Sequence, residues 1–205
     1  MHYKLTEEIL KLSVSNFWDS AKIEWTFESA YESEEQQTCL CGHFPIRNIC
    51  VIRNKNNNVI TEVGNCCINK FLGIDEGNKI FISIKRLKID LTKSMSIEVV
   101  EYLKSKNILN DFEYNFYNDI LRKRKLSDKQ LEIKKKINKK LLDYTSYEIN
   151  SQFSRINLVL EWAKNKPGFD KSFINSLKIS CERTGKLTDK QKIAIENIIK
   201  KWKIE

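Results

Sequence analysis

The chain has 205 residues, 41% of them hydrophobic, and a formal net charge of +9. This length and apolar content suffice for packed cores and exclude a disordered chain. The start lacks the basic-then-apolar layout of a secretion signal, and no apolar run approaches the roughly 18 residues that cross a bilayer, so we expect a cytoplasmic protein without a membrane partner. Six cysteines in such a chain indicate reduced thiols and a metal rather than disulfides.

The first residues predict one helix and one strand. Apolar residues at helical spacing predict an amphipathic helix over about residues 6–17. The period then changes to two over residues 22–28, which places Ile23 and Trp25 on one face of a strand. The acidic segment 31–37 is predicted to be a loop that leads into the first cysteines.

The next segment predicts a β-hairpin followed by a helix. Two β-branched runs, at 48–53 and 58–63, are joined by the turn-forming residues 54–57. Asn65 can cap a short helix that begins near Cys66. The order is therefore a cysteine-containing knuckle, a hairpin and a helix that carries cysteine in its first turn.

Soft metal-ligand side chains flank this hairpin. A knuckle can bring two cysteines to one ion, while the hairpin returns the chain so that the start of the helix approaches from the opposite side. We take as the zinc-ligand set Cys39, Cys41, His43 and Cys67. Cys66 and Cys50 are held in reserve, because adjacent cysteines do not both point comfortably at one ion and Cys50 can be a small buried hydrophobe.

The residues around these cysteines resemble a known group of proteins. The recurring elements are Glu24-Trp25, Tyr31-Glu32, Cys39 to Ile46, Ile52-Arg53-Asn54 and Val63 to Phe71. Together they are similar to small uncharacterised zinc-binding proteins of phages and bacterial mobile elements, over roughly residues 24–72. The resemblance implies a metal module without a settled activity, and it aligns Cys67 rather than Cys66 with the recurring cysteine.

Charge is distributed unevenly along the chain. From Met1 to Thr38, eight acidic residues face three lysines, a net charge of about −5. Between Arg122 and Lys140, ten basic residues face two acidic ones, a net charge of about +8. Such a basic stripe attracts nucleic acid, DNA or RNA, although lysine-rich helix faces are often only solubilising. The predicted phosphate contacts are Arg122, Lys123, Arg124, Lys125, Lys135, Lys136, Lys139 and Lys140, with Arg47, Arg53 and Lys55 of the hairpin as a second patch.

The second half contains an internal repeat. A Phe-x-x-x-Phe stripe from Phe112 and a later Lys-Leu-Ser/Thr-Asp-Lys-Gln block recur from Phe169 onward. Ser127 and Thr188 each begin a capping box, so each starts a helix. Each copy is predicted as three helices, with Ile133, Ile137 and Leu141 inward in the first and Ala194, Ile198 and Trp202 inward in the second. Five lysines are predicted on the solvent-exposed face of the first capped helix: Lys134, Lys135, Lys136, Lys139 and Lys140.

These elements predict an α+β protein. We expect a treble-clef-like zinc domain over residues 1–90 and two helical repeats over 91–145 and 146–205. Catalysis has little support, because there is no phosphate loop or His-Glu-x-x-His motif and the chain holds two histidines, His2 and His43.

Three functions follow from this pattern. The leading hypothesis is a zinc-stabilised, non-enzymatic nucleic-acid-binding accessory protein of phage or mobile-element type. The second is an interaction module that docks on a polymerase, nuclease or defence component through its acidic, aromatic N-terminal face or its helical repeats. The third, a metal-dependent hydrolase, would use Glu62 or Glu24 as a base. Sequence specificity, oligomeric state and the identity of any protein partner stay open.

Overall fold

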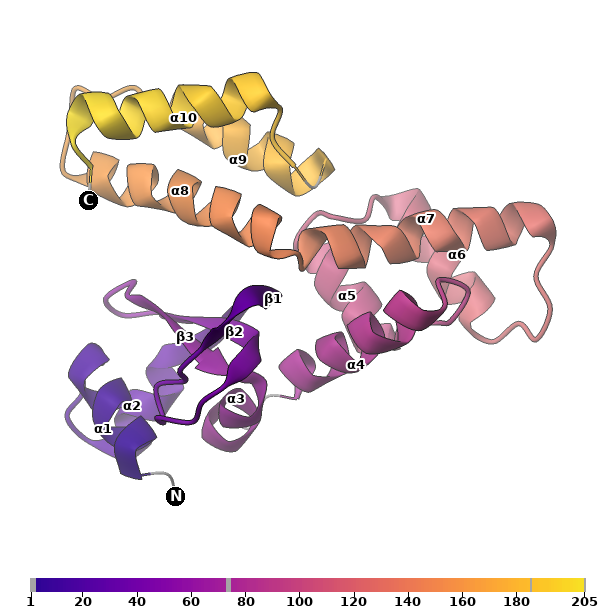
Figure 1. The fold of residues 1–205 in the computed structure, drawn as a ribbon, viewed down its shortest axis with the longest axis horizontal. Helices are drawn as coiled ribbons and strands as arrows, with labels where there is room; N and C mark the ends of the chain where they lie inside the picture. The colour runs from indigo at the N-terminus through magenta and orange to yellow at the C-terminus, as the bar shows by residue number, and fades with distance from the viewer. Residues whose placement is uncertain (1–2, 73–74, 185, 205) are drawn as a thin grey trace. The chain divides into compact units, whose positions relative to one another are not determined.

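The computed structural model describes residues 3–72, 75–184 and 186–204 (Figure 1). The fold is α+β, as predicted, with a three-stranded antiparallel sheet in the order β1-β2-β3 and many helices. The chain divides into two compact units, Met1–Val99 and Val100–Glu205. The predicted division of the helical part near residue 145 stays a prediction. Among the described residues, no helix is both long and apolar enough to cross a membrane.

The first unit contains the sheet and the helices around it. Its elements are α1 (Tyr3–Leu12), α2 (Trp18–Ala21), a 3-10 turn (Lys22–Glu24), β1 (Trp25–Gln37), β2 (Ile46–Asn54), β3 (Ile60–Gly64), α3 (Asn65–Leu72) and α4 (Glu76–Ile89). The boundary between the units falls within α5 (Ile97–Ser105). The second unit continues with α6 (Asp111–Leu121), α7 (Asp128–Tyr144), α8 (Tyr147–Lys164), α9 (Ser172–Thr184) and α10 (Asp189–Trp202).

The N-terminal helix is shorter than predicted. α1 ends at Leu12 instead of continuing to Phe17, which is largely exposed. The backbone N–H groups of Val14 and Ser15 both donate to the carboxylate of Glu24, each at 2.8 Å. This buried carboxylate satisfies donors that a continuing helix would have bonded to its own carbonyls, so the chain turns here.

The first strand differs from the prediction at both ends. Residues 22–24 form a 3-10 turn, and Ile23 is exposed while Trp25 is buried. The segment 31–37 is strand and not loop, because it continues the antiparallel pairing of β1 with β2, with an irregularity between Glu32 and Gln37. Tertiary pairing therefore overrides the acidic composition of this edge strand, whose Glu34 and Glu35 are exposed.

The predicted hairpin and the helix after it are present. β2 and β3 pair from Arg53 opposite Ile60 to Ile49 opposite Gly64, and α3 begins directly after that glycine. The helix α4 has no counterpart among the predicted elements. Its Gly77 lies against β2 and α3, since a Cβ placed there would come within 2.8 Å of the Cys50 sulfur.

In the second unit, the predicted helices form at the predicted capping boxes. The Ser127 hydroxyl accepts from the backbone of Gln130, and the Thr188 hydroxyl from that of Gln191, with the reciprocal bonds present in both boxes. Two details of the predicted inward faces differ from the structure. Lys134, predicted to face solvent, is buried. In α10 the buried residue is Ile195, which the pattern did not select, while the predicted Ile198 packs partly buried against the same core and Trp202 is 47% exposed. Which face of a helix is buried depends on the helices that pack against it, and the periodicity of the sequence does not show where those helices lie.

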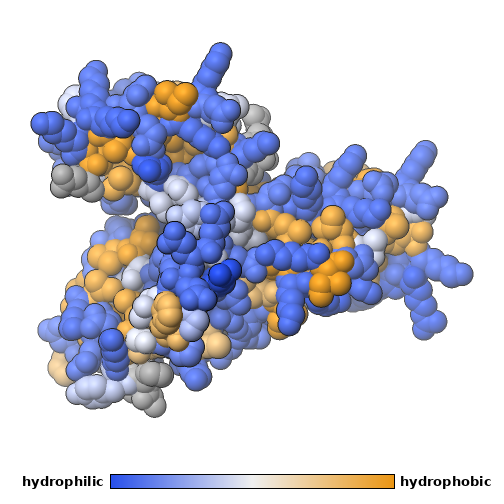
Figure 2. Space-filling view, viewed as in Figure 1, coloured by the Kyte–Doolittle hydropathy of each residue, from blue (hydrophilic) through white to orange (hydrophobic). Residues whose placement is uncertain are grey.

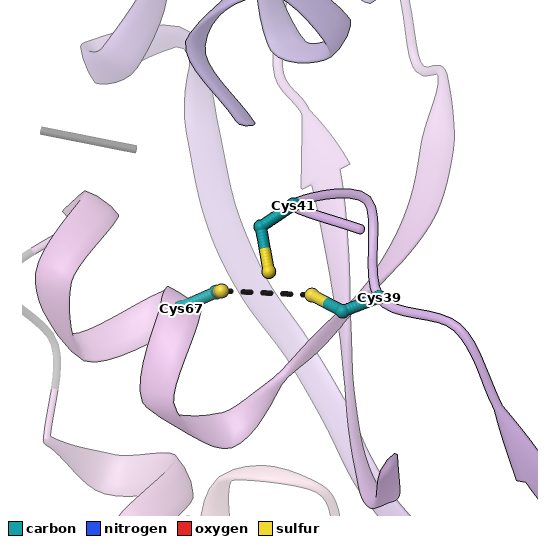
Figure 3. Close-up of side chains that lie close together, drawn as sticks. All are labelled: Cys39, Cys41 and Cys67. Carbon is teal, nitrogen blue, oxygen red and sulfur yellow. Dashed lines mark hydrogen bonds between the residues drawn. The ribbon is translucent and has the colours of Figure 1, made fainter. Parts of the chain in front are cut away.

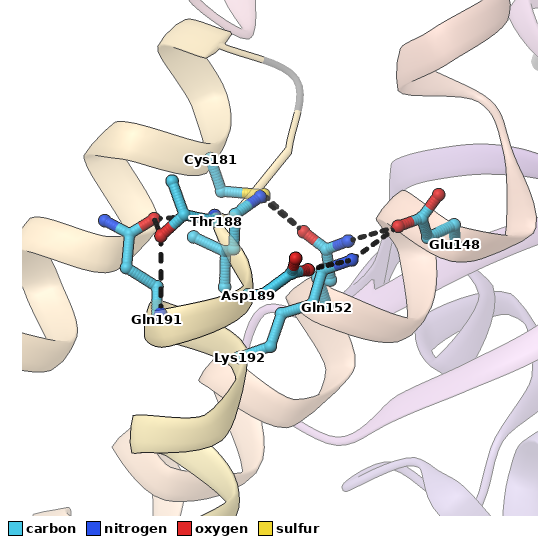
Figure 4. Close-up of polar contacts among 8 residues, drawn as sticks. Glu148, Gln152, Cys181, Thr188, Asp189, Gln191 and Lys192 are labelled. Carbon is cyan, nitrogen blue, oxygen red and sulfur yellow. Dashed lines mark hydrogen bonds and ion pairs between the residues drawn. The ribbon is translucent and has the colours of Figure 1, made fainter.

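A buried amide joins the helices α8, α9 and α10 (Figure 4). The Gln152 side chain accepts from the backbone N–H of Leu187 at 2.7 Å, faces the Cys181 sulfur at 3.9 Å and donates to Glu148. It lies beside an apolar core that includes Ile156, Leu177 and Ile195. The amide thus satisfies the backbone just before α10 and fixes where that helix begins.

Candidate functional site

The knuckle that carries the first two cysteines is a tight, glycine-dependent turn. The backbone N–H of Cys39 donates to the carbonyl of His43 at 3.0 Å, and that of Gly42 donates to the carbonyl of Cys39 at 2.7 Å. Gly42 has φ of +85°, a conformation that residues with a side chain rarely adopt, and Nζ of Lys4 lies 3.0 Å from the position that a Cβ would take. The sequence Cys-Leu-Cys-Gly therefore folds back on itself and turns both sulfurs inward.

The third cysteine comes from the first turn of α3 (Figure 3). The sulfurs of Cys39, Cys41 and Cys67 point toward one another, are all buried and lie within 4.8 Å of each other. The Cys39 and Cys67 sulfurs are 3.5 Å apart, too far for a disulfide. Three thiols that the sequence separates by the whole hairpin thus converge at one point.

This arrangement can hold a metal ion. Thiolates that share one tetrahedral zinc ion at 2.3 Å each lie roughly 3.8 Å apart, within the range of separations seen here. The backbone N–H of Gly64 also donates to the Cys39 sulfur at 3.2 Å. Such N–H donors offset the negative charge that thiolates bring to a metal.

The same contacts shift the pKa of the thiols. The hydrogen bond shared with Cys67, with help from the backbone N–H groups of Gly64 and Cys41, holds the pKa of the Cys39 thiol below its ordinary value. The pKa of the Cys67 thiol is raised, because it shares that hydrogen bond and is buried beside Cys39. Without a cation one proton therefore stays in the pair, and a bound metal would release it.

The other predicted ligand and the two reserve cysteines lie outside the group of three, although His43 and Cys66 line the same pocket. His43 is exposed, and its role as fourth ligand stays a prediction. Cys66 is exposed, whereas Cys50 is buried on the sheet and burial raises the pKa of its thiol to about 12. Cys50 thus has the environment of a packing residue.

A pocket of about 1160 Å³ opens beside the three cysteines. Its walls include Trp18, Arg47 and Lys70, which belong to α2, β2 and α3. Lys70 could have been found from the sequence, because it follows Cys67 by three residues on the same helix face. Trp18 carries no comparable signal, since only the fold brings it to the cysteines.

The predicted basic stripe is largely exposed. Arg122, Lys123, Arg124 and Lys125 occupy the connection between α6 and α7, around which hydrophilic side chains project (right side of Figure 2). Lys136 and Lys139 are exposed on α7, together with Lys129, which sequence reasoning missed despite its seven-residue spacing from Lys136. Lys135 pairs with Glu132 at 2.9 Å and Lys140 with Glu113 at 2.7 Å, so these two are already engaged.

The hairpin residues do not form one patch. Arg53 is tied to Glu28 by an ion pair at 3.2 Å, and Lys55 is exposed in the turn. Arg47 is roughly 20 Å from Arg53 along β2, given the rise of an antiparallel strand. Arg47 therefore belongs with the cysteine pocket rather than with the hairpin turn.

The carboxylates considered for a hydrolase are engaged in structural contacts. Glu62 accepts from the Tyr31 hydroxyl at 2.9 Å. Glu24 accepts from the Asn54 amide at 2.6 Å as well as from the two backbone N–H groups after α1. Among the described residues, neither belongs to the group of ligands around the cysteines.

No protein-family model, curated protein or solved structure matches the chain.

Proposed function

We propose that this chain is a zinc-stabilised, non-enzymatic nucleic-acid-binding protein, an accessory factor of phage or mobile-element type. Nucleic acid binds along a basic surface of the second unit, and the ion stabilises the first unit. The observation that carries the proposal is the run of four exposed basic residues between α6 and α7, here called the basic loop (Arg122, Lys123, Arg124 and Lys125).

The basic loop supports phosphate binding because its side chains are positively charged and exposed. Within the described residues, none of its four side chains forms an ion pair. Lys136 and Lys139 extend the positive charge along α7, whereas the pairs of Lys135 and Lys140 make those two weaker candidates. Exposed, unpaired cations gain most from phosphate, because contact releases counterions without breaking an existing pair.

Zinc is the proposed occupant of the cysteine group. Thiolates favour zinc over magnesium or calcium, which take oxygen ligands. The order of knuckle, hairpin and helix, with Cys67 at the start of α3, supports a treble-clef-like module. The ion would stabilise this module by holding the knuckle against the start of α3.

The order of the helices from α5 to α10 supports the proposed repeat. α7 and α10 begin at equivalent capping boxes, and each follows two helices, α5 and α6 in one copy and α8 and α9 in the other. The copies differ in charge, since only the first carries the basic loop. We therefore assign phosphate binding to the first copy.

The test is the binding of the full chain to fluorescein-labelled duplex DNA, single-stranded DNA and RNA as salt is raised. Contact with six phosphates of a duplex predicts a fall in affinity of about a thousandfold between 50 and 200 mM salt. The variant Lys123→Ala/Arg124→Ala/Lys125→Ala should reduce the slope of log affinity against log salt by about two to three.

A matched control removes three charges from α10, in Lys190→Ala/Lys200→Ala/Lys201→Ala. These lysines are exposed in the same unit and lie outside the basic loop, so the slope should stay close to that of the natural chain. Equal losses in both variants would mean that net charge alone attracts the nucleic acid. That result, or an affinity independent of salt, would contradict the proposal.

Docking on a protein through the acidic face has less support. Trp25 and Tyr31, two aromatic residues of this N-terminal segment, are buried, while Glu28 and Glu32 form ion pairs with Arg53 and Lys88. An interface built on exposed aromatic anchors needs those side chains at the surface.

A further inference from the structure

We infer that the pocket beside the three cysteines receives one nucleotide unit of a single-stranded nucleic acid. Its phosphate would contact Arg47 and Lys70, and its base would lie against Trp18. The inference rests on the proposed nucleic-acid function, and it adds a second contact site, in the first unit, with a different ligand preference from the basic loop.

The charged side chains around the pocket are basic. The described lining of the pocket includes Arg47 and Lys70 and no acidic residue. Both side chains are exposed, and neither forms an ion pair among the described residues. Lys4 adds a third cation next to Gly42 of the knuckle. A zinc ion with three thiolates would carry a net charge of −1, so these cations leave the pocket positive and suited to a phosphate.

The remaining lining suits a nucleobase. Trp18 offers an aromatic surface, and stacking on such a surface tolerates every base because each base has a π face. Gln36 and Asn48 line the same pocket and provide amide donors and acceptors that match base edges. A carboxylate-rich peptide would use the cations but would leave the aromatic ring and the amides without a role.

Size and shape favour a single strand over a duplex. The volume of about 1160 Å³ exceeds the roughly 300–1000 Å³ of typical small-molecule pockets, which is ample for one nucleotide. Bases within a duplex are stacked and paired, so one of them would enter only after being unstacked at a cost. An unpaired strand presents its bases without that cost.

The experiment measures the affinity of the full, zinc-loaded chain for fluorescein-labelled 12-nucleotide oligo(dT) and oligo(U). Arg47→Ala/Lys70→Ala should weaken single-strand binding about tenfold and lower the salt slope by about one to one and a half. Trp18→Ala should also cost about tenfold, while Trp18→Phe, which keeps an aromatic ring, should retain most of the affinity. The ratio of the affinities for the two oligonucleotides shows whether the pocket prefers DNA or RNA.

The matched control is Lys85→Ala/Arg86→Ala, which removes one lysine and one arginine from the exposed side of α4 in the same unit. It should bind within about twofold of the natural chain, since these charges are away from the pocket lining. Circular dichroism and zinc content establish that each variant is folded and loaded. Trp18→Phe covers the case in which Trp18→Ala does not fold.

The outcomes separate this inference from the proposed function. If the Arg47/Lys70 variant binds single strands like the natural chain while the basic-loop variant loses affinity, the pocket inference is wrong and the proposed function stands. If the pocket variant alone loses affinity, the inference stands and the basic loop loses its role. Absence of oligonucleotide binding by the natural chain, or binding of hexaglutamate instead, would overturn the inference.

Discussion

The sulfur atoms of Cys39 and Cys67 lie 3.5 Å apart, although 28 positions separate them in the sequence. The knuckle and the first turn of α3 are brought together by the hairpin between them. With the Cys41 sulfur nearby, the two segments share one point of contact that a cation can hold. The stability of this module should therefore depend on metal.

We predict that the reduced chain binds one zinc ion and that Cys67→Ser weakens the binding by more than the roughly hundredfold that loss of an outer hydrogen-bond partner costs. The reason is that Cys67 supplies a ligand and not a supporting contact. Titration with a competing chelator measures the affinity, and chelation should lower the melting temperature of the natural chain.

Cys66→Ser is the matched control, because Cys66 is the exposed neighbour of Cys67. It should keep both the zinc and the melting temperature. His43→Ala measures whether the histidine on the pocket rim completes the site. Retention of full affinity by Cys67→Ser would contradict the proposed ligand set.

The group of three cysteines was predictable from the sequence to the extent that its members stand in short local motifs. Cys39 and Cys41 stand in one short motif, and the hairpin pattern explains how a cysteine beyond it returns to them. The pocket was not predictable, because Trp18 and Arg47 reach it from elements whose packing the sequence pattern does not report. A residue's neighbours across the fold depend on the whole core.

The carboxylate of Glu24 gives the second prediction. Glu24→Gln should lower the melting temperature at neutral pH by several degrees, because the amide accepts less strongly than the carboxylate from Asn54, Val14 and Ser15. The control is Glu7→Gln, which changes an exposed carboxylate of α1 and should leave the melting temperature nearly unchanged.

This contribution should also depend on pH. The Asn54 hydrogen bond, followed by the two backbone donors, lowers the pKa of the Glu24 carboxyl in the folded state. A lowered folded-state pKa means that the stabilisation is complete above the unfolded value of about 4.3 and is lost as the pH falls through the folded value. Thermal melts of the natural chain and Glu24→Gln should therefore converge below about pH 4. A constant difference down to pH 3 would show that charge is not the cause.

The same carboxylate explains why the start of the chain was predicted less well than the second unit. A helix beginning at Ser127 or Thr188 is specified by residues three positions apart, so the capping boxes could be recognised directly. The end of α1 is specified by Glu24, which lies ten residues from Val14 and makes sense only once the chain has turned. Local signals were predictable, and contacts created by folding were not.

Gln152 gives the third prediction. Gln152→Leu should destabilise the second unit by about 1–3 kcal/mol, because the buried N–H of Leu187 loses its acceptor. The control is Lys192→Met, which removes the exposed ion pair with Glu148 and should change stability little. Urea unfolding followed by circular dichroism measures both. An equal loss of stability in the two variants would mean that the buried hydrogen bond contributes no more than the exposed ion pair.

The last prediction concerns the contact between Gly77 and Cys50. A Cβ added at Gly77 would lie 2.8 Å from the Cys50 sulfur and 3.3 Å from Cγ2 of Ile68. Gly77→Ala should therefore destabilise the chain by about 1–3 kcal/mol. This cost opposes the gain of up to about 1 kcal/mol that alanine normally brings to a helix.

A double-mutant cycle identifies the sulfur as the cause. Cys50→Ala removes the clashing atom, so the double variant Cys50→Ala/Gly77→Ala should be more stable than the sum of the single changes by about 0.5–3 kcal/mol. Gly168→Ala is the control, since nothing lies within 4 Å of its Cβ, and it should stay within about 0.5 kcal/mol of the natural chain. Because Cys50 lies outside the group formed by Cys39, Cys41 and Cys67, zinc content should be unchanged in every member of the cycle. Additive energies would mean that the two residues do not compete for the same space.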